Sequence, residues 1–328
     1  MPRGYALIPE VPAVSVEPVR WCREEEVRVE EHGALDPAVV AAHRAELEGG
    51  RRFGFGRNWR SFAAGVDATA IAEAERSVLA LLEPSGLVRD GRLDGVRLLD
   101  AGCGSGLFSL AALRLGAEVT AFDFDPDSVL TTRALIAAEG PPDAADRVTV
   151  LHGSVLDAGF LASLGAFDVV YSWGVLHHTG AMWDACRTVA TAVRPGGALV
   201  IALYHDAGRA STVWWGIKRL SAALPRPLQV VLAAGLLVPI EGYALVRSLL
   251  RADPVGYVRR WTGYRSLRGM SRWHDHLDWV GGFPYEWAGP EEVIDFHREL
   301  GFEHLLTVPA VAWGCNEFTF RRDPAPAA

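Results

Sequence analysis

Short apolar runs alternate with longer amphipathic stretches through the middle of the chain. Two stretches, 107–116 and 127–140, carry apolar residues at helical spacing. The runs around them have the length of buried strands. These runs are VRLLD at 96–100, VTAFD at 119–123, VTVL at 148–151 and FDVVYS at 167–172. Strands that alternate with helices in this way predict crossover connections and a parallel sheet with helices on both faces.

A fifth strand is predicted at ALVIALY, 198–204, because the turn residues RPGG, 194–197, stand directly before it. The alternation then stops until 290–302, where proline and acids open a stretch that ends near a glycine, as helices often do. Two last strands are predicted at 305–308 and 317–322. The pattern therefore predicts an α/β fold with a doubly wound, mostly parallel sheet of seven strands.

The same pattern divides the chain into segments. An irregular N-terminal arm at 1–35 mixes prolines with an acidic cluster, and a helical cover follows at 36–95. We expect the insertion after the fifth strand to form a helical cap over the site. The remaining segments are the first part of the core at 96–204, the cap at 205–288, the closing helix and strands at 289–322 and a tail at 323–328.

A glycine-rich loop follows the first strand. In LLDAGCGSG, 98–106, the residues Gly102, Gly104 and Gly106 alternate with others, and Asp100 precedes them. Glycine allows backbone angles that other residues avoid and lets a ligand approach the main chain. A nicotinamide-dinucleotide fingerprint would need glycine at position 107, which is Leu107. The spacing favours a different nucleotide-like ligand.

A carboxylate ends the second strand at the place where a ribose would lie. Asp123 stands about twenty residues beyond the first glycine, where its side chain can accept hydrogen bonds from both ribose hydroxyls. The third strand leads into HGSVLD, 152–157, whose Ser154 and Val155 are placed to border an adenine ring. Strand ends therefore predict the sugar and base contacts.

Five elements in order, DAGCGSG, VTAFDFDPDSV, GSVLD, FDVVYSWGVLHHTG and RPGG, resemble the class I S-adenosylmethionine-dependent methyltransferases. Among these, the chain looks most like the quinone-biosynthesis type that acts on small molecules. The resemblance implies a Rossmann-like fold, S-adenosyl-L-methionine as cofactor and S-adenosyl-L-homocysteine as product. It implies cofactor contacts from Asp100, Gly102, Cys103, Gly104, Ser105, Gly106, Asp123, Phe124, Ser154, Val155, Ser172 and Trp173. Ser154 departs from the acid that many relatives carry, although a hydroxyl can also accept a hydrogen bond.

Methyl transfer from a sulfonium mainly requires the reacting atoms to be held in line, and a base is needed only when the acceptor arrives protonated. His177 and His178 follow the fourth strand, whose carboxyl end faces the cofactor in such a sheet. They are catalytic candidates, either as a base or as a wall of the cofactor pocket. Tyr204 and His205 end the fifth strand, where they either contact the substrate or only terminate the strand.

A second polar cluster lies in SRWHDHLDWVGGFPYEW, 271–287. His274 and Asp278 are the alternative catalytic pair, and His276 and Glu286 are candidate substrate contacts. Two histidines and a carboxylate can bind a metal, but sulfonium chemistry needs none, so no metal is predicted. The competing interpretation is a hydrogen-bonded loop.

The residues 228–250 are apolar nearly throughout and are interrupted by Pro239 and Glu241. We expect two buried or half-buried cap helices here and no transmembrane segment. Such helices could pack in the cap, in a homodimer, or against a membrane surface or lipid-like substrate. The following arginines and aromatic residues, 251–273, could bind an anionic molecule, but the net charge of −8 disfavours nucleic acid.

Composition limits the location and the partners. Half of the residues are apolar, the four cysteines form no close pair, and the first residues lack the apolar core of a signal peptide. We therefore expect a cytoplasmic methyltransferase that acts on a small, partly apolar acceptor, such as an aromatic metabolite, and more readily on oxygen than on nitrogen or carbon. The alternatives are another use of the sulfonium, a cofactor-binding protein without activity and, last, RNA methylation.

Overall fold

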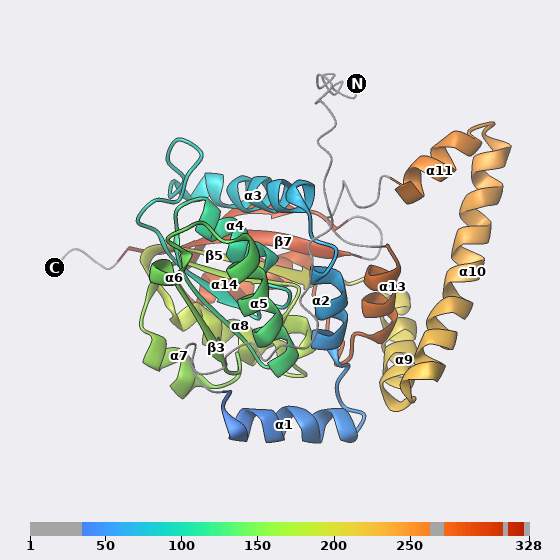
Figure 1. The fold of residues 1–328 in the computed structure, drawn as a ribbon, viewed down its shortest axis with the longest axis horizontal. Helices are drawn as coiled ribbons and strands as arrows, with labels where there is room; N and C mark the ends of the chain where they lie inside the picture. Colours follow the sequence, from blue (N-terminus) through green and yellow to red (C-terminus); the bar gives the residue numbers. More distant parts are fainter. Residues whose placement is uncertain (1–34, 263–271, 311–313, 325–328) are drawn as a thin grey trace.

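The computed structural model describes residues 35–262, 272–310 and 314–324. The predicted N-terminal arm, apart from its last residue, and most of the tail lie outside these ranges. The described residues form a seven-stranded sheet in the order β3-β2-β1-β4-β5-β7-β6 (Figure 1). The strands are β1 (Arg97–Ala101), β2 (Glu118–Asp123), β3 (Val148–His152), β4 (Phe167–Trp173), β5 (Val193–Tyr204), β6 (Phe302–Val308) and β7 (Cys315–Arg322).

The first five strands are parallel, and β7 runs antiparallel to both of its neighbours, β5 and β6. This arrangement confirms the predicted doubly wound, mostly parallel sheet. Strand β5 begins at Val193 and so includes the RPGG residues that the sequence places in a turn. Its pairing with β4 shifts register between Phe167 and Val169, which accommodates these residues within the strand.

Helices cover both faces of the sheet, and each face has its own apolar core. On one face α3 (Ala68–Leu82), α4 (Leu107–Arg114) and α5 (Pro126–Glu139) pack on alternate strand residues such as Leu98 and Val169. On the other, α7 (Ala158–Leu164), α8 (Met182–Thr191) and α14 (Pro290–Glu299) pack on Leu99 and Val170. Neighbouring residues of one strand thus enter opposite cores, as the strand period requires.

The predicted helical cover consists of three helices and a short turn. The first helix, α1 (Pro37–Glu48), is capped at its N-terminus by Asp36, whose carboxylate accepts from the amides of Ala38 and Val39. The next, α2 (Phe55–Ala63), packs against α5, while α3 lies over the sheet and leads into the 3-10 turn η2 (Glu83–Ser85). A four-residue helix, α6 (Ala144–Arg147), precedes β3.

The insertion leaves the sheet and returns to it at one place. His205 pairs with Ala288 in a parallel bridge directly beyond the end of β5, and the Ala288 amide donates to the Tyr204 carbonyl (3.1 Å). Between these points lie α9 (Arg209–Ala223), α10 (Arg226–Leu250), α11 (Pro254–Thr262) and α13 (Arg272–Gly281). They stand together beside the sheet and α2 (Figure 1). A small core of Ala233, Leu277 and Val280 holds α9, α10 and α13 together.

The prediction of two cap helices at 228–250 is wrong, because α10 is one helix of 25 residues with Pro239 inside it. Proline removes one hydrogen bond to the residue four positions earlier, here Gly235. Both residues face solvent, where water can satisfy the freed carbonyl. Only Ala233 and Glu241 of α10 are fully buried, and Val230, Leu232 and Leu236 are partly buried in the cap, so the expected half-burial holds for one side of the helix only. By length and composition, α10 is the one helix of the described residues that could cross a membrane.

Candidate active site

The glycine loop joins β1 to α4 in a conformation that requires glycine. Gly102 and Gly106 have φ angles of +89° and +81°, in the left-handed region. A Cβ atom on Gly102 would lie 2.4 Å from the Val175 side chain, and one on Gly106 would lie 2.8 Å from the Thr132 backbone. Neither neighbour leaves room for a side chain. The loop backbone is therefore held close to the strand ends, with its amides at the start of a helix.

Asp123 ties this loop to the end of β2. One oxygen of its carboxylate accepts from the Gly104 amide (2.9 Å) and the other from the Asp125 amide (2.8 Å). Burial raises the pKa of this carboxyl to about 6. Each carboxylate oxygen can accept a second hydrogen bond, so the two amides orient the group without exhausting it. The geometry suits a carboxylate that receives two ligand hydroxyls.

Four other predicted cofactor residues are buried within the loop or beside it. Burial, opposed by a 2.5 Å hydrogen bond from the Ser109 hydroxyl, raises the pKa of Asp100 to about 7. The Ser172 hydroxyl donates to the Ala101 carbonyl (2.7 Å) and so links β4 to β1. Burial also raises the pKa of the Cys103 thiol well above its usual value. Ser105 is buried beside them. Their direct contact with a cofactor stays a prediction.

The remaining predicted cofactor residues follow β2, β3 and β4. Val155 is buried, and the Ser154 hydroxyl accepts from the Leu156 amide (3.2 Å), which leaves its proton available to a ligand. The Phe124 ring lies beside the Arg52 guanidinium, and the Trp173 indole donates to Glu317 of β7 (3.1 Å). All four residues stand at the carboxyl edge of the sheet, where ligands bind in open α/β folds.

The N-terminal helices cover the loop, which sequence reasoning missed. The Trp59 indole lies 3.2 Å from the position that a Cβ atom on Gly104 would take. Arg52 donates to the His178 carbonyl (3.2 Å), and its guanidinium carbon lies 4.8 Å from the Phe124 ring centre. The signal was present in RRFGFGRNWR, 51–60, where cations and aromatic residues are interleaved. This segment therefore forms a wall beside the glycine loop, at the predicted cofactor site.

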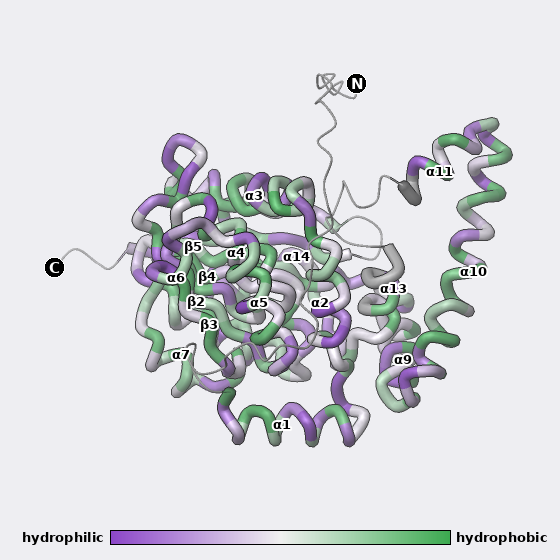
Figure 2. The backbone as a smooth tube through the Cα atoms, viewed as in Figure 1, coloured by the Kyte–Doolittle hydropathy of each residue, from purple (hydrophilic) through white to green (hydrophobic). Residues whose placement is uncertain are grey.

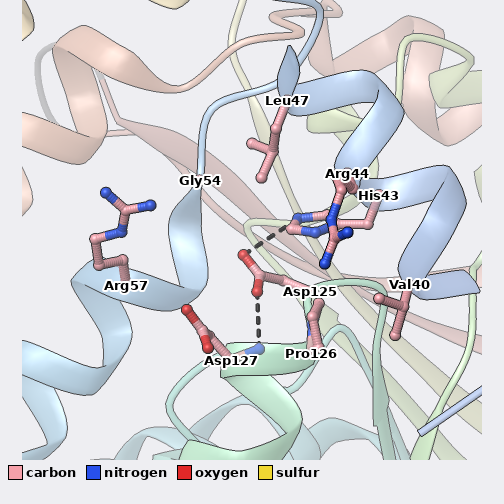
Figure 3. A pocket seen from close by; sticks show the side chains of 9 residues that line it. All are labelled: Val40, His43, Arg44, Leu47, Gly54, Arg57, Asp125, Pro126 and Asp127. Atoms are coloured by element: carbon pink, nitrogen blue, oxygen red, sulfur yellow. Dashed lines mark hydrogen bonds and ion pairs between the residues drawn. The ribbon is translucent and has the colours of Figure 1, made fainter. Parts of the chain in front are cut away.

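Asp125 anchors this wall at its outer end. Its carboxylate accepts from the Gly56 amide of α2 (2.7 Å) and lies 3.4 Å from the His43 imidazole of α1. Burial would raise the pKa of Asp125, but the contacts with His43 and the neighbouring amides hold it below its usual value. Figure 3 shows a small open pocket here, between α1, α2 and the start of α5. Its lining is Val40, His43, Arg44, Leu47, Gly54, Arg57, Asp125, Pro126 and Asp127.

The paired histidines form the 3-10 turn η3 (Leu176–His178) directly after β4. Both side chains are buried. The His178 Nδ1 atom lies 2.6 Å from the Pro284 carbonyl, and because a carbonyl only accepts, Nδ1 carries the proton. Burial, followed by the charge of Lys218, lowers the pKa of His177 to about 3, and burial lowers that of His178 well below its usual value. Both imidazoles are therefore neutral at neutral pH.

The histidines belong to an aromatic cluster that closes on a buried lysine. The Tyr204 ring centre lies 4.2 Å from that of His177, 5.5 Å from that of His178 and 5.0 Å from that of Tyr285. The Lys218 ammonium lies 5.1 Å from the Tyr204 ring centre and 4.7 Å from that of Tyr285, and it donates to the Trp279 carbonyl. We call these five residues, His177, His178, Tyr204, Tyr285 and Lys218, the acceptor cluster. Sequence reasoning missed Lys218 and Tyr285, although a lysine within the apolar run VWWGIK was a signal.

The other predicted substrate residues bond to separate parts of the fold. His205 lies 3.0 Å from the Gly314 carbonyl, and His276 lies 2.8 Å from the Ala233 carbonyl inside the cap. Both Glu286 oxygens accept from the Met182 amide (3.1 Å), so this carboxylate caps α8, and burial raises its pKa. Roles of these three residues in substrate binding stay predictions.

The alternative catalytic pair, His274 and Asp278, lies in α13, so the interpretation of this segment as a loop is wrong. Their side chains are outside the described part of the structure. The described side chains include no group of three potential ligands placed to hold a metal ion.

The chain is similar in sequence to known methyltransferases over part of its length. The family model described as a methyltransferase domain matches residues 99–201. The ubiquinone biosynthesis O-methyltransferase of Xanthomonas oryzae is 31% identical over 194 residues, which cover 58% of this chain and 74% of the relative. The corresponding enzyme of Xanthomonas campestris is 36% identical over 109 residues, 33% of this chain and 43% of the relative. The chain thus spans less than half of the length of that relative.

Solved structures include magnesium protoporphyrin IX methyltransferase from Synechocystis PCC 6803 with bound S-adenosylhomocysteine. It has a TM-score of 0.48 and 15% identity, and the match covers 88% of this chain and 100% of that one. For mitomycin 7-O-methyltransferase the TM-score is 0.45 and the identity 16%, over 87% and 67% of the two chains. The family assignment rests on the Xanthomonas oryzae relative and the ordered loop elements. On this basis, the chain belongs to the class I S-adenosylmethionine-dependent methyltransferases.

Proposed function

We propose that this protein transfers the methyl group of S-adenosyl-L-methionine to an oxygen atom of a small, partly apolar acceptor. The observation that carries the proposal is the meeting of two sites at one sheet edge. The glycine loop with Asp123 forms the first, and the acceptor cluster after β4 and β5 forms the second. The ends of neighbouring parallel strands lie at the same edge, so the two sites adjoin.

The residues present fit the cofactor. The backbone at Gly102 is shaped by Val175 so that no side chain fits, and Asp123 is held by two amides with acceptor capacity left for ribose hydroxyls. Trp59 and Phe124 offer apolar surface, and Ser154 offers a hydroxyl to an adenine. When bound, the cofactor supplies a methyl group made electrophilic by the sulfonium.

The acceptor cluster favours an oxygen nucleophile. A cationic amine would meet the Lys218 ammonium at close range in a desolvated region, where like charges repel strongly. A phenolate or carboxylate would instead be attracted by this charge and could pack on the rings of Tyr204 and Tyr285. The acceptor oxygen forms the new bond to carbon while the carbon–sulfur bond breaks, and both electrons of that bond stay with sulfur.

The histidines orient the acceptor in this proposal. An efficient general base has a pKa near the working pH, whereas that of His177 is about 3. Because His178 Nδ1 is bonded to Pro284, its Nε2 atom can only accept a hydrogen bond while the ring is neutral. An acidic acceptor that arrives ionised needs no base. For an acceptor that arrives protonated, a general base among His177, His178, His274 and Asp278 is the alternative.

Calorimetric titration with S-adenosyl-L-methionine tests the cofactor site. We expect Asp123→Ala to weaken binding at least tenfold, because hydrogen bonds to a charged acceptor contribute about 1.5–3 kcal/mol. Asp94→Asn is the matched control, since this carboxylate is exposed and pairs with Arg92. Equal affinities of wild type and Asp123→Ala would contradict the proposed ribose contact.

Mass spectrometry of a panel of phenols, carboxylic acids and amines tests the reaction. We expect a product heavier by one methyl group, together with S-adenosyl-L-homocysteine, from oxygen acceptors. Exclusive methylation of amines would contradict the preference for oxygen. Cofactor binding without turnover on any acceptor class would favour a binding protein, and turnover to another product would favour a different use of the sulfonium. The cytoplasmic location and a homodimer stay predictions.

A further inference from the structure

Helix α10 carries an apolar face that the described part of the protein does not cover. Most of its exposed residues recur at spacings of three and four, which places them on one side of the helix, whereas Ile240 and Arg247 are exposed outside this side. Val238 is 71% exposed and Leu250 is 83% exposed, values far above those of a cap helix that packs in a core. The face, called here the α10 face, contains Leu228, Val231, Gly235, Val238, Gly242, Tyr243, Leu245, Val246, Leu249 and Leu250.

The opposite side of α10 joins the helix to the cap. Ala233 is buried against α13, where its carbonyl lies 2.8 Å from the His276 imidazole. Glu241 is buried as well and accepts from the Tyr257 hydroxyl of α11 (3.2 Å). Beyond this point α10 contacts mainly α11, which turns back from the far end of α10 toward the rest of the molecule (Figures 1 and 2). The α10 face is thus presented by a helix that is anchored along its other side.

Charge around this face differs from that of the whole chain. Residues 226–259 contain four arginines and two acids, whereas the chain carries a net charge of −8. Arg247, Arg251 and Arg259 are exposed, while one of the two acids, Glu241, is buried and bonded to Tyr257. The α10 face itself has no charged residue. An apolar strip with arginines at its C-terminal end and on the following helix α11 is complementary to an anionic lipid surface.

We propose that the α10 face binds to the surface of a membrane that contains anionic lipids. Its apolar side chains enter the boundary between headgroups and acyl chains, and Arg247, Arg251 and Arg259 contact lipid phosphates. A full crossing is disfavoured, because it would place Glu241 in hydrocarbon and separate α10 from α9 and α13. A second copy on this face is the competing occupant, and the oligomeric state of the variants distinguishes it from a membrane surface.

Sedimentation of the full-length protein with liposomes tests the proposal. We expect binding to liposomes of equal parts phosphatidylglycerol and phosphatidylcholine, and little binding to phosphatidylcholine alone. The double variant Val246→Glu/Leu250→Glu should lose at least tenfold in partitioning. The matched control is Leu130→Glu, which places the same charge on an exposed leucine of α5, outside the cap. Cofactor affinity should be unchanged in all variants, which shows that the fold and the cofactor site are intact.

The arginines give an independent readout. Arg247→Gln/Arg251→Gln should weaken binding to the anionic liposomes by about fivefold for each arginine, and high salt should do the same to the wild type. Equal sedimentation of wild type and the glutamate variant would overturn the proposal. So would a lipid-free wild-type dimer that the glutamate variant converts to a monomer, because the face would then be covered by a second copy.

Discussion

At the sheet edge, close neighbours leave no room for a side chain at the glycines of the loop. A Cβ atom would meet Val175 at Gly102, Thr132 at Gly106 and Trp59 at Gly104. Each glycine of the loop is therefore confined by a different neighbour. The positive φ angles and the missing side chains serve one purpose, which is to bring the loop backbone against the strand ends. A substitution at one of these glycines should therefore disturb both the cofactor site and the stability of the fold.

Replacing Gly102 by alanine should destabilise the protein by more than its backbone angle alone explains. Left-handed backbone costs a non-glycine residue about 1–2 kcal/mol, and the clash with Val175 at 2.4 Å adds to this. Gly86→Ala is the matched control, because Gly86 has a left-handed φ of +73° with nothing within 4 Å of its Cβ position. Chemical denaturation of both variants measures the difference. Equal losses of stability would show that the loop yields to the added methyl group.

At the scale of elements, periodicity identified strands and helices well where burial was uniform. All seven predicted strands and the helix after Pro290 are present, because each packs one or both faces in the core. The errors lie in the insertion. There α10 continues through Pro239, and α13 replaces an expected loop, because contacts among cap helices and with solvent decide the outcome. Proline is a reliable helix end only where its lost hydrogen bond cannot be replaced.

Pro239→Ala should strengthen α10. Interior proline is about 3 kcal/mol less favourable than alanine in a helix, although water already satisfies part of the lost bond here. Hydrogen exchange of peptides that cover 236–250 should slow, because the helix would open less often. Pro227→Ala is the control, since Pro227 stands in the first turn, where proline is tolerated. Faster or unchanged exchange in Pro239→Ala would show that the proline fits α10 without cost.

In the whole molecule, the cap and the core meet at the acceptor cluster. Lys218 comes from α9 of the cap, Tyr204 from β5 and the two histidines from the turn after β4. The buried ammonium therefore links the insertion to the sheet edge and acts on the histidines by its charge. The contact between Lys218 and the histidine region depends on packing between segments that are far apart in the sequence.

Lys218→Met should raise the pKa of His177 from about 3 toward its ordinary value, because the second largest cause of its depression disappears while burial remains. The folded pKa lies below the unfolded one, so acid weakens the fold between about pH 6.5 and 3, and the variant should lose less stability there. Titration of the imidazole signals by NMR measures the pKa. Turnover of acidic acceptors should fall at least tenfold while cofactor affinity stays constant. An unchanged His177 pKa would contradict the electrostatic link.

The sequence by itself determined the sheet, the glycine loop and Asp123, because these depend on local periodicity and on backbone needs of neighbouring residues. Only the tertiary structure showed that Trp59 and Arg52 cover the loop, that Lys218 is buried among the rings, and that the α10 face is exposed. The physical reason is that burial, pKa and exposure depend on which distant segments pack together. The local sequence around a lysine in an apolar run, or around a leucine in a long helix, is the same whether the side chain is buried or exposed.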